Sequence, residues 1–215
     1  MKSTEQIAQE LNKLIEAHYY SEDFELLSSI RAFADSMCEG DKDTLAGIVM
    51  KRLMDEGSIV DILLCSVLSI PSAVSILAGR LSNENVPNQI TRALISALRK
   101  YKNDTAYTAV ERFVDSEQEM EALQALAEID FVRTLPLMSR LMQKEHYHGI
   151  VLHILHLRMK EVGIDQLIRD ITLTSISTST SFKDSLVKSL NSKKEPYNPF
   201  RESEILRIIK AVRPA

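Results

Sequence analysis

Tryptophan is absent from this chain of 215 residues, and glycine and proline occur only six times each. The many tight turns of an all-β protein normally use glycine and proline, so their scarcity argues against a β-sandwich or barrel. Hydrophobic residues make up 45% of the sequence and charged residues 26%, which is ordinary for a folded globular protein and far from the composition of disordered chains. The composition therefore predicts an all-α fold with a hydrophobic core of its own.

Cysteine is also scarce, because Cys38 and Cys65 are the only two, which is too few for a disulfide framework. The first residues, MKSTEQIAQE, are not a basic segment followed by an apolar one, so they do not resemble a secretion signal. We therefore expect a cytoplasmic protein in which both cysteines are small core residues.

Long apolar runs and a strong charge of one sign are missing as well. The longest apolar candidate, SIVDILLCSVLSI, contains Asp61 and is shorter than the roughly 18 residues that predict a transmembrane helix, so no membrane span is expected. The net charge is −4, with 12 acidic and 6 basic side chains in residues 1–60 and 4 acidic and 8 basic ones in residues 171–215. These surpluses predict polar association surfaces, but neither is dense enough to require nucleic acid.

What the sequence does contain is a succession of helix boundaries. Ser3 and Gln6 fit a capping box ahead of an apolar helical stripe, and Asn103 is placed to cap a later helix. Gly57 and Ser58 end one helical segment and begin the next, which reads IVDILLCSVLS. Because such boundaries recur every 15 residues or so, the sequence predicts short helices joined by short turns.

Apolar positions repeat when the sequence is shifted by 28 residues against itself. The residues that coincide in three successive segments are Leu94, Ile95, Ala97 and Leu98, then Ala122, Leu123, Ala125 and Leu126, then Ile150, Val151, His153 and Ile154. Helix pairs that recur at a period near 30 residues are typical of α-solenoids, in which each pair buries its apolar face against the next.

The best-preserved unit, ALQALAEIDFVRTLPLMSRLM at residues 122–142, resembles a HEAT repeat. The residues that match the pattern of that family are Ala122, Leu123, Ala125, Leu126, Ala127, Ile129, Asp130, Leu135, Pro136, Leu137 and Leu141. The resemblance is best over residues 92–162. It implies an all-α, right-handed α-solenoid of antiparallel helix pairs over residues 1–171, with C-terminal capping helices in residues 172–215, and by itself it implies no chemistry. The same periodicity leaves a generic helical bundle open as the alternative.

Two local features qualify this outline. Proline at position 136 would interrupt a helix that began at Phe131, so the sequence predicts Thr134 as the N-cap, with Pro136 in the first turn. Residues 172–181, TLTSISTSTS, contain eight Ser or Thr, whose side chains compete with the hydrogen bonds of a helical backbone. We expect an irregular connector there, packed with the capping helices on the same domain.

Four of the five histidines fall within EHYHGIVLHILHLRMK, residues 145–160. On a helix, His146, His153, His156 and Lys160 form one narrow polar stripe. His153 and His156 are three residues apart, as two metal ligands can be, but no spacing in the sequence identifies a third ligand. We therefore predict no metal and no other cofactor, and we treat His153, His156 and Lys160 as candidate binding residues.

Three arginines, Arg80, Arg112 and Arg140, occupy equivalent places in successive repeats. A row of arginines on one face could follow a phosphate backbone. The alternative is a brace, in which each guanidinium binds a carboxylate or a helix C-terminal carbonyl of the neighbouring repeat. An isoelectric point near 5.8 favours the brace over phosphate contacts.

The sequence lacks the glycine-rich motifs of nucleotide-binding proteins and the nucleophile motifs of hydrolases. Among HEAT-like enzymes, deoxyhypusine hydroxylases bind iron through His-Glu pairs, and alkylation-repair DNA glycosylases use tryptophan beside an acidic residue; this sequence has neither feature. The leading hypothesis is a non-enzymatic scaffold, such as an inhibitor or immunity-type protein, whose second helices present a groove to a protein partner. The alternative is a nucleic-acid-binding protein related to DNA repair, using the arginine row and the basic C-terminal segment.

Overall fold

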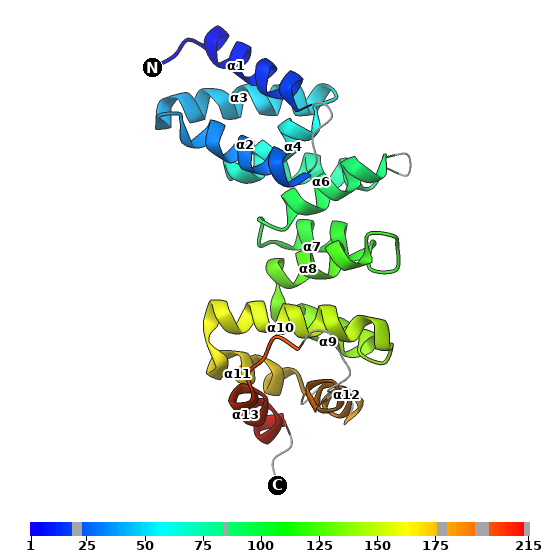
Figure 1. Ribbon diagram of the computed structural model, residues 1–215. Helices are drawn as coiled ribbons and strands as arrows, with labels where there is room; N and C mark the ends of the chain where they lie inside the picture. The colour runs from blue at the N-terminus through cyan, green and yellow to red at the C-terminus, as the bar shows by residue number, and fades with distance from the viewer. Residues whose placement is uncertain (19–22, 84–85, 176–179, 192–197, 213–215) are drawn as a thin grey trace. The chain divides into compact units, whose positions relative to one another are not determined.

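A computed structural model of the chain describes residues 1–18, 23–83, 86–175, 180–191 and 198–212 (Figure 1). Every regular element in these residues is a helix, which confirms the prediction of an all-α fold for the described part of the chain. The elements are α1 (Thr4–Ala17), α2 (Asp23–Asp35), α3 (Glu39–Asp55), α4 (Ile59–Val67), α5 (Ala73–Leu81), α6 (Asn88–Leu98), α7 (Asp104–Glu111), α8 (Glu119–Ile129), α9 (Phe131–Leu141), η1, a 3-10 turn (Glu145–Tyr147), α10 (His148–Val162), α11 (Ile164–Ser175), α12 (Thr180–Asn191) and α13 (Glu202–Val212).

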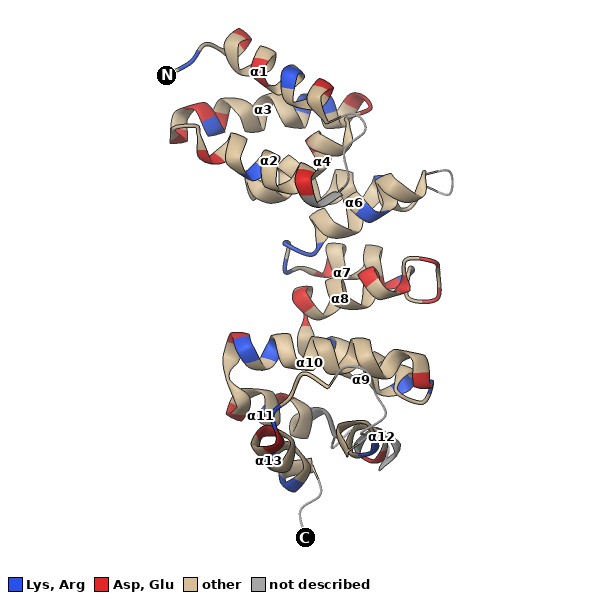
Figure 2. Ribbon diagram, in the orientation of Figure 1, with Lys and Arg blue, Asp and Glu red and all other residues tan. Residues whose placement is uncertain are grey.

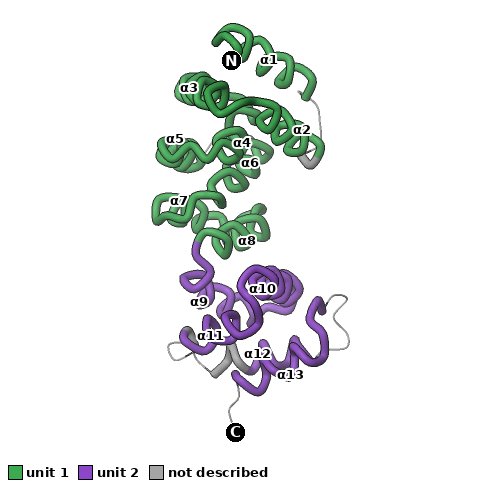
Figure 3. The backbone as a smooth tube through the Cα atoms, turned by 90° about the vertical axis from the view of Figure 1, so that its left-hand side faces the viewer, with its two compact units in different colours: residues 1–129 green, residues 130–215 purple. Residues whose placement is uncertain are grey.

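The chain divides into two compact units (Figure 3), which are residues 1–129, with α1 to α8, and residues 130–215, with α9 to α13. In unit 1 the helices contact one another in two rows. Helices α1, α3, α5 and α7 contact in succession and form the odd row, while α2, α4, α6 and α8 do the same and form the even row. Contacts between α3 and α4, α5 and α6, and α7 and α8 join the two rows, and their facing apolar side chains form the core.

The start of α4 shows how local sequence sets a helix boundary. Gly57 has a φ of 46°, a left-handed conformation that glycine adopts without strain, and this ends the segment that follows α3. Ser58 Oγ accepts a hydrogen bond from the Asp61 N–H at 3.2 Å, and the Asp61 carboxylate accepts one from the Ser58 N–H at 2.7 Å. The turn predicted here is confirmed, and the reciprocal capping box fixes the first turn of α4.

The carboxylate of Asp61 also joins three helices of unit 1. The side chain is completely buried, and besides the capping bonds it accepts a hydrogen bond from Arg52 Nε of α3 at 3.0 Å. Arg52 Nη1 in turn donates to Asn12 Oδ1 of α1 at 3.1 Å. A buried carboxylate is tolerated only when paired and hydrogen-bonded, and these bonds meet that need.

The two cysteines differ in their surroundings. Cys65 of α4 is fully buried, as predicted, and burial together with the Asp61 carboxylate raises the pKa of its thiol to about 12, so the thiol stays protonated and unreactive at neutral pH. The prediction that Cys38 is also a core residue is wrong, because it is exposed. Cys38 is the N-cap of α3, where the chain enters the helix at the surface, and the buried residue at this corner is its neighbour Met37.

The prediction about the proline of α9 in unit 2 is also wrong. The helix begins directly after Asp130, whose Oδ1 accepts a hydrogen bond from the Arg133 N–H at 3.0 Å, and Pro136 lies inside the helix. Thr134 does not cap the helix; its Oγ1 donates to the Asp130 carbonyl at 2.7 Å and so reinforces the first turn. Pro136 is exposed, as is Val132, whose carbonyl loses its helical donor, so the interruption falls on the outer side of the helix.

The C-terminal helices pack within unit 2. α12 contacts α9, α11 and α13, and α13 also contacts α11, so the two helices expected after the connector are present. The expectation of an irregular segment is wrong at its two ends, because α11 continues to Ser175 and α12 begins at Thr180; residues 176–179 lie outside the described residues. Thr172 Oγ1 donates to the Ile168 carbonyl at 2.8 Å, four residues earlier, so the hydroxyl bonds along the helix without breaking it.

Arg158 of α10 connects three helices of unit 2. Its Nε and Nη2 atoms both donate to Asp170 Oδ2 of α11 at 3.2 Å, and Nη1 pairs with Glu161 at 3.1 Å. The guanidinium lies 5.1 Å from the ring centroid of Phe131 of α9, a cation–π contact. Asp170 is only 3% exposed, so this arginine compensates a buried negative charge.

Candidate functional site

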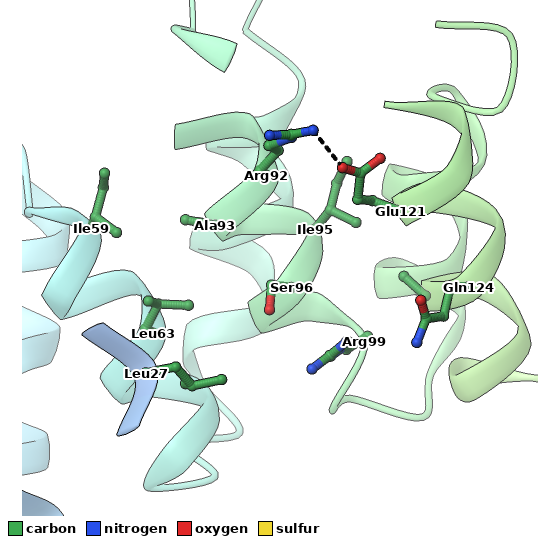
Figure 4. Close-up of a pocket in the computed structure, with 11 residues that line it drawn as sticks. Leu27, Ile59, Leu63, Arg92, Ala93, Ile95, Ser96, Arg99, Glu121 and Gln124 are labelled. Atoms are coloured by element: carbon green, nitrogen blue, oxygen red, sulfur yellow. Dashed lines mark ion pairs between the residues drawn. The ribbon is translucent and has the colours of Figure 1, made fainter. Parts of the chain in front are cut away.

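A groove of about 240 Å³ lies on the even row of unit 1, where α6 runs between α4 and α8 (Figure 4). The residues that line it come from four helices of that row and are Leu27, Ile59, Leu63, Arg92, Ala93, Ile95, Ser96, Arg99, Glu121, Gln124 and Ala125. Four of these, Leu63, Ala93, Ile95 and Ala125, are buried and give the groove an apolar floor.

Two ion pairs connect α6 and its C-cap residue Arg99 with α8, and three of the four paired residues line this groove. Arg92 Nη2 lies 2.8 Å from Glu121 Oε1, and Arg99 Nη1 lies 3.7 Å from Glu128 Oε1 (Figure 4 shows the first pair). The members of each pair are 29 residues apart, which reflects the helix repeat. Arg99 Nε is buried and has no hydrogen-bond partner among the described residues. One guanidinium nitrogen beside the groove therefore lacks the acceptor that a buried donor normally has.

A second lobe of about 290 Å³ continues the groove past Ser96 and Arg99 and shares Leu27 with the first. Its other lining residues are Arg31, Asp35, Ser66, Val67 and Lys100. Arg31 and Lys100 make no ion pair among the described residues, and Figure 2 shows basic residues where α6 leads into α7. We call the two lobes together the even-row groove.

The chemistry of the even-row groove is that of recognition. Its apolar floor can bury an apolar side chain, its arginines and Lys100 can pair with anions, and Gln124 and Ser96 can exchange hydrogen bonds with a backbone. Its lining contains no cysteine or histidine. In the part of the chain that the structure describes, no three His, Cys, Asp or Glu side chains are placed to hold a metal ion together.

The predicted arginines lie on other helices. Arg80 Nη2 of α5 donates to the Gly57 carbonyl at 3.4 Å, and its Nη1 is buried without a partner among the described residues. Arg112, at the end of α7, donates from Nη1 to Ser82 Oγ at 3.3 Å. Each guanidinium thus reaches back to the segment that ends the preceding helix of the odd row, which is the geometry of a brace. Arg140 is exposed in the last turn of α9, in unit 2.

Three residues of the predicted histidine stripe, His153, His156 and Lys160, lie on α10 of unit 2. The prediction is wrong for His146, which lies in the 3-10 turn η1 before that helix. The ring of His156 meets the ring of Phe200 edge-on, with 5.3 Å between centroids, and its Nδ1 is buried without a partner among the described residues. His153 is half-buried and Lys160 is exposed. The segment that leads into α13 therefore occupies the place where a ligand of His156 would bind.

We expect the stability of unit 2 to fall at acid pH because of His156. Burial, the Lys160 ammonium and His153 lower the pKa of His156 below its ordinary 6.5, outweighing the opposing Glu204 carboxylate. Below about pH 6.5 the unfolded chain takes up a proton that the folded chain resists, so stability is lost as pH falls and is unaffected above that range. Urea unfolding at about pH 7.5 and about pH 5 measures this effect. The free energy of unfolding should fall less between the two pH values in His156→Leu than in the wild type. An equal loss in both proteins would contradict the role given to this ring.

The odd row also has a groove, of about 490 Å³, and it is more open than the even-row groove. Small and hydroxyl side chains line it, among them Ser75 and Gly79 of α5 and Thr105 and Thr108 of α7, with Arg112 at one edge. This is the face on which the sequence led us to expect a binding groove. Because it is more open, it encloses less of a partner's side chain, so it is the weaker candidate.

Sequence reasoning missed the residues of the even-row groove. Arg92, Ser96 and Arg99 are spaced so that they share one face along α6 and its C-cap. Glu121 and Glu128 follow at a constant offset of 29 residues from the two arginines. The signal was present as opposite charges at a constant offset, whereas the predicted arginine row used charges of one sign only.

Comparison with known proteins adds no relative, since no protein-family model, curated protein or solved structure matches the chain. None of the described helices is both long enough and apolar enough to cross a membrane.

Proposed function

We propose that this protein is a non-enzymatic, HEAT-like scaffold that binds a protein partner through the even-row groove. The observation that carries the proposal is a two-lobed groove, with a buried apolar floor and a charged rim, built from four successive helices of one row. A floor of this kind favours side chains of another polypeptide, because apolar contacts supply affinity and polar groups at the edge supply direction.

The contacts of unit 1 support an α-solenoid in preference to a generic bundle. Successive helices of each row touch, and the rows are joined pair by pair, as expected when each helix pair buries its apolar face against the next. The arginine braces from Arg80 to Gly57 and from Arg112 to Ser82 recur from one pair to the next. In a solenoid, one row of helices commonly forms the binding surface.

The alternative of nucleic-acid binding has less support. Arg80 and Arg112 direct their guanidinium groups to Gly57 and Ser82 of their own chain. Glu121 lines the even-row groove and Glu128 pairs with Arg99, and these carboxylates would repel a phosphate backbone. Binding to duplex DNA remains a defined outcome of the experiments below.

Blocking the groove tests the proposal. Ser96 lies in the lining of both lobes, and its side chain points into the open space in Figure 4. Ser96→Trp should fill that space and reduce the affinity for a partner by at least about tenfold, close to 1.4 kcal/mol. The measurement is quantitative mass spectrometry of proteins retained from the native cell by immobilised wild type and variant, followed by binding titration of each purified candidate.

The matched control is Ser75→Trp, which adds the same indole to the exposed face of α5 on the odd row. A partner lost with Ser96→Trp and kept with Ser75→Trp supports the even-row groove. The reverse pattern would move the binding surface to the odd row, and a partner kept by both variants would refute a groove-binding function. Circular dichroism and unfolding curves of both variants ensure that the comparison is between folded proteins.

A further inference from the structure

The second lobe of the even-row groove has an excess of positive charge that the other side chains of its lining do not neutralise. Arg31, Arg99 and Lys100 line it, against the single carboxylate of Asp35. Arg31 and Lys100 form no ion pair among the described residues, whereas Arg99 pairs with Glu128 at 3.7 Å. In a chain with a net charge of −4, this local surplus of cations is opposite in sign to the whole protein.

Arg99 adds a geometric reason to place an anion in this lobe. Its Nε is buried and has no hydrogen-bond partner in the described part of the chain, although a guanidinium normally uses its donors in pairs on a planar acceptor. Only 26% of the Arg99 side chain is exposed, so water is a poor hydrogen-bond partner for this buried nitrogen. A carboxylate bound in the lobe could accept a hydrogen bond from the Arg99 guanidinium and compete with Glu128 for it.

The first lobe, with the apolar floor, lies next to the second lobe along α6. We call them the apolar lobe and the basic lobe. Arg92 and Arg99 are seven residues apart, so the groove extends about 10 Å along the helix axis. An extended peptide advances about 3.3 Å per residue, so three or four residues span that length. The two lobes share Leu27, Ser96 and Arg99, which brings an apolar pocket and an anion pocket within reach of neighbouring residues of one peptide.

From these observations, and resting on the proposed function, we infer that the even-row groove recognises an acidic segment of its protein partner. The segment places a large apolar side chain over Leu63 and Ala93, and an Asp or Glu two or three residues away pairs with Arg31, Arg99 and Lys100. A polyphosphate is a poorer occupant because Asp35 and Glu121 line the same groove and Glu128 pairs with Arg99, whereas a single carboxylate meets less repulsion.

Selection from a phage-displayed library of random eight-residue peptides tests the inference on the full chain. Enriched peptides should have more acidic than basic residues, with a large apolar residue within three positions of an Asp or Glu. Synthesised and labelled with fluorescein, they should bind Arg31→Glu/Lys100→Glu at least tenfold more weakly than the wild type in fluorescence anisotropy, and more weakly as salt rises. The control with the same charge change, Lys13→Glu/Lys51→Glu, alters two exposed lysines of α1 and α3 and should keep the affinity.

The outcomes separate this inference from the function on which it rests. Neutral or basic peptides that bind and are lost with Ser96→Trp would overturn the acidic preference and leave the groove function standing. Peptides that are unaffected by Ser96→Trp would overturn both. A labelled DNA duplex that binds at low salt and is lost with Arg31→Glu/Lys100→Glu would identify a polyanion site and also overturn the inference.

Discussion

Replacing Asp61 by alanine should lower the free energy of unfolding by about 3 kcal/mol. The carboxylate is completely buried, accepts from Arg52 Nε at 3.0 Å, and accepts from the N–H and hydroxyl of Ser58 at 2.7 Å each. Alanine leaves these donors without their acceptor and removes half of the capping box of α4. Arg52 is 36% exposed, so water recovers part of the loss and keeps the effect at the lower end for a broken buried ion pair.

Urea unfolding followed by circular dichroism measures the effect, with Asp55→Ala as the control. Asp55 is exposed at the end of α3, and its replacement should change stability by less than about 0.5 kcal/mol. The Asp61 change also bears on binding, because Ile59 and Leu63 of the same helix line the even-row groove. If Asp61→Ala stayed within about 1 kcal/mol of the wild type, the capping and pairing of α4 would not determine its stability.

In unit 2, replacing Arg158 by methionine should destabilise the protein by about 3 to 5 kcal/mol. Methionine keeps much of the packing of the arginine stem but removes both 3.2 Å bonds to Asp170 and the cation–π contact with Phe131. Asp170 is nearly buried and keeps Gln166 Nε2 as a donor at 2.6 Å, which does not offset a buried negative charge.

A second variant separates loss of charge balance from loss of packing. Arg158→Met combined with Asp170→Leu removes both charges, and it should recover most of the stability lost in the single variant, since apolar replacement of a whole buried pair is often neutral. Arg201→Met serves as the control, because Arg201 is exposed in the same unit. A double variant as unstable as Arg158→Met would show that the contact matters through packing and not through the uncompensated charge of Asp170.

Features that depend on neighbouring residues were predictable from the sequence. The capping box of Ser3 and Gln6 and the Asn103 cap form as expected, and so does the turn at Gly57, because each needs only residues within one helical turn. Pro136 was misplaced for a local reason too. Asp130 and Thr134 are both good cap residues, and the helix begins directly after the first of them.

The candidate site was not predictable in the same way. Arg92 meets Glu121 and Arg99 approaches Glu128 across 29 residues, and these contacts depend on which face of α6 turns toward α8. The arginines that the repeat did identify, Arg80 among them, contact their own chain. The sequence repeat therefore predicts the succession of helices. The position of the groove depends on how two neighbouring helices are rotated about their axes.

The contrast between the two cysteines makes the even-row groove open to direct optical study. Cys65 is enclosed and protonated, whereas Cys38 is exposed, so a thiol-reactive fluorophore has one accessible attachment point in the native chain. Cys38 follows Asp35 of the basic lobe by three residues, a chain length of at most about 11 Å. A dye on this thiol would stand at the end of the groove, where the arrival of an acidic peptide changes its surroundings, and no engineered cysteine would be required.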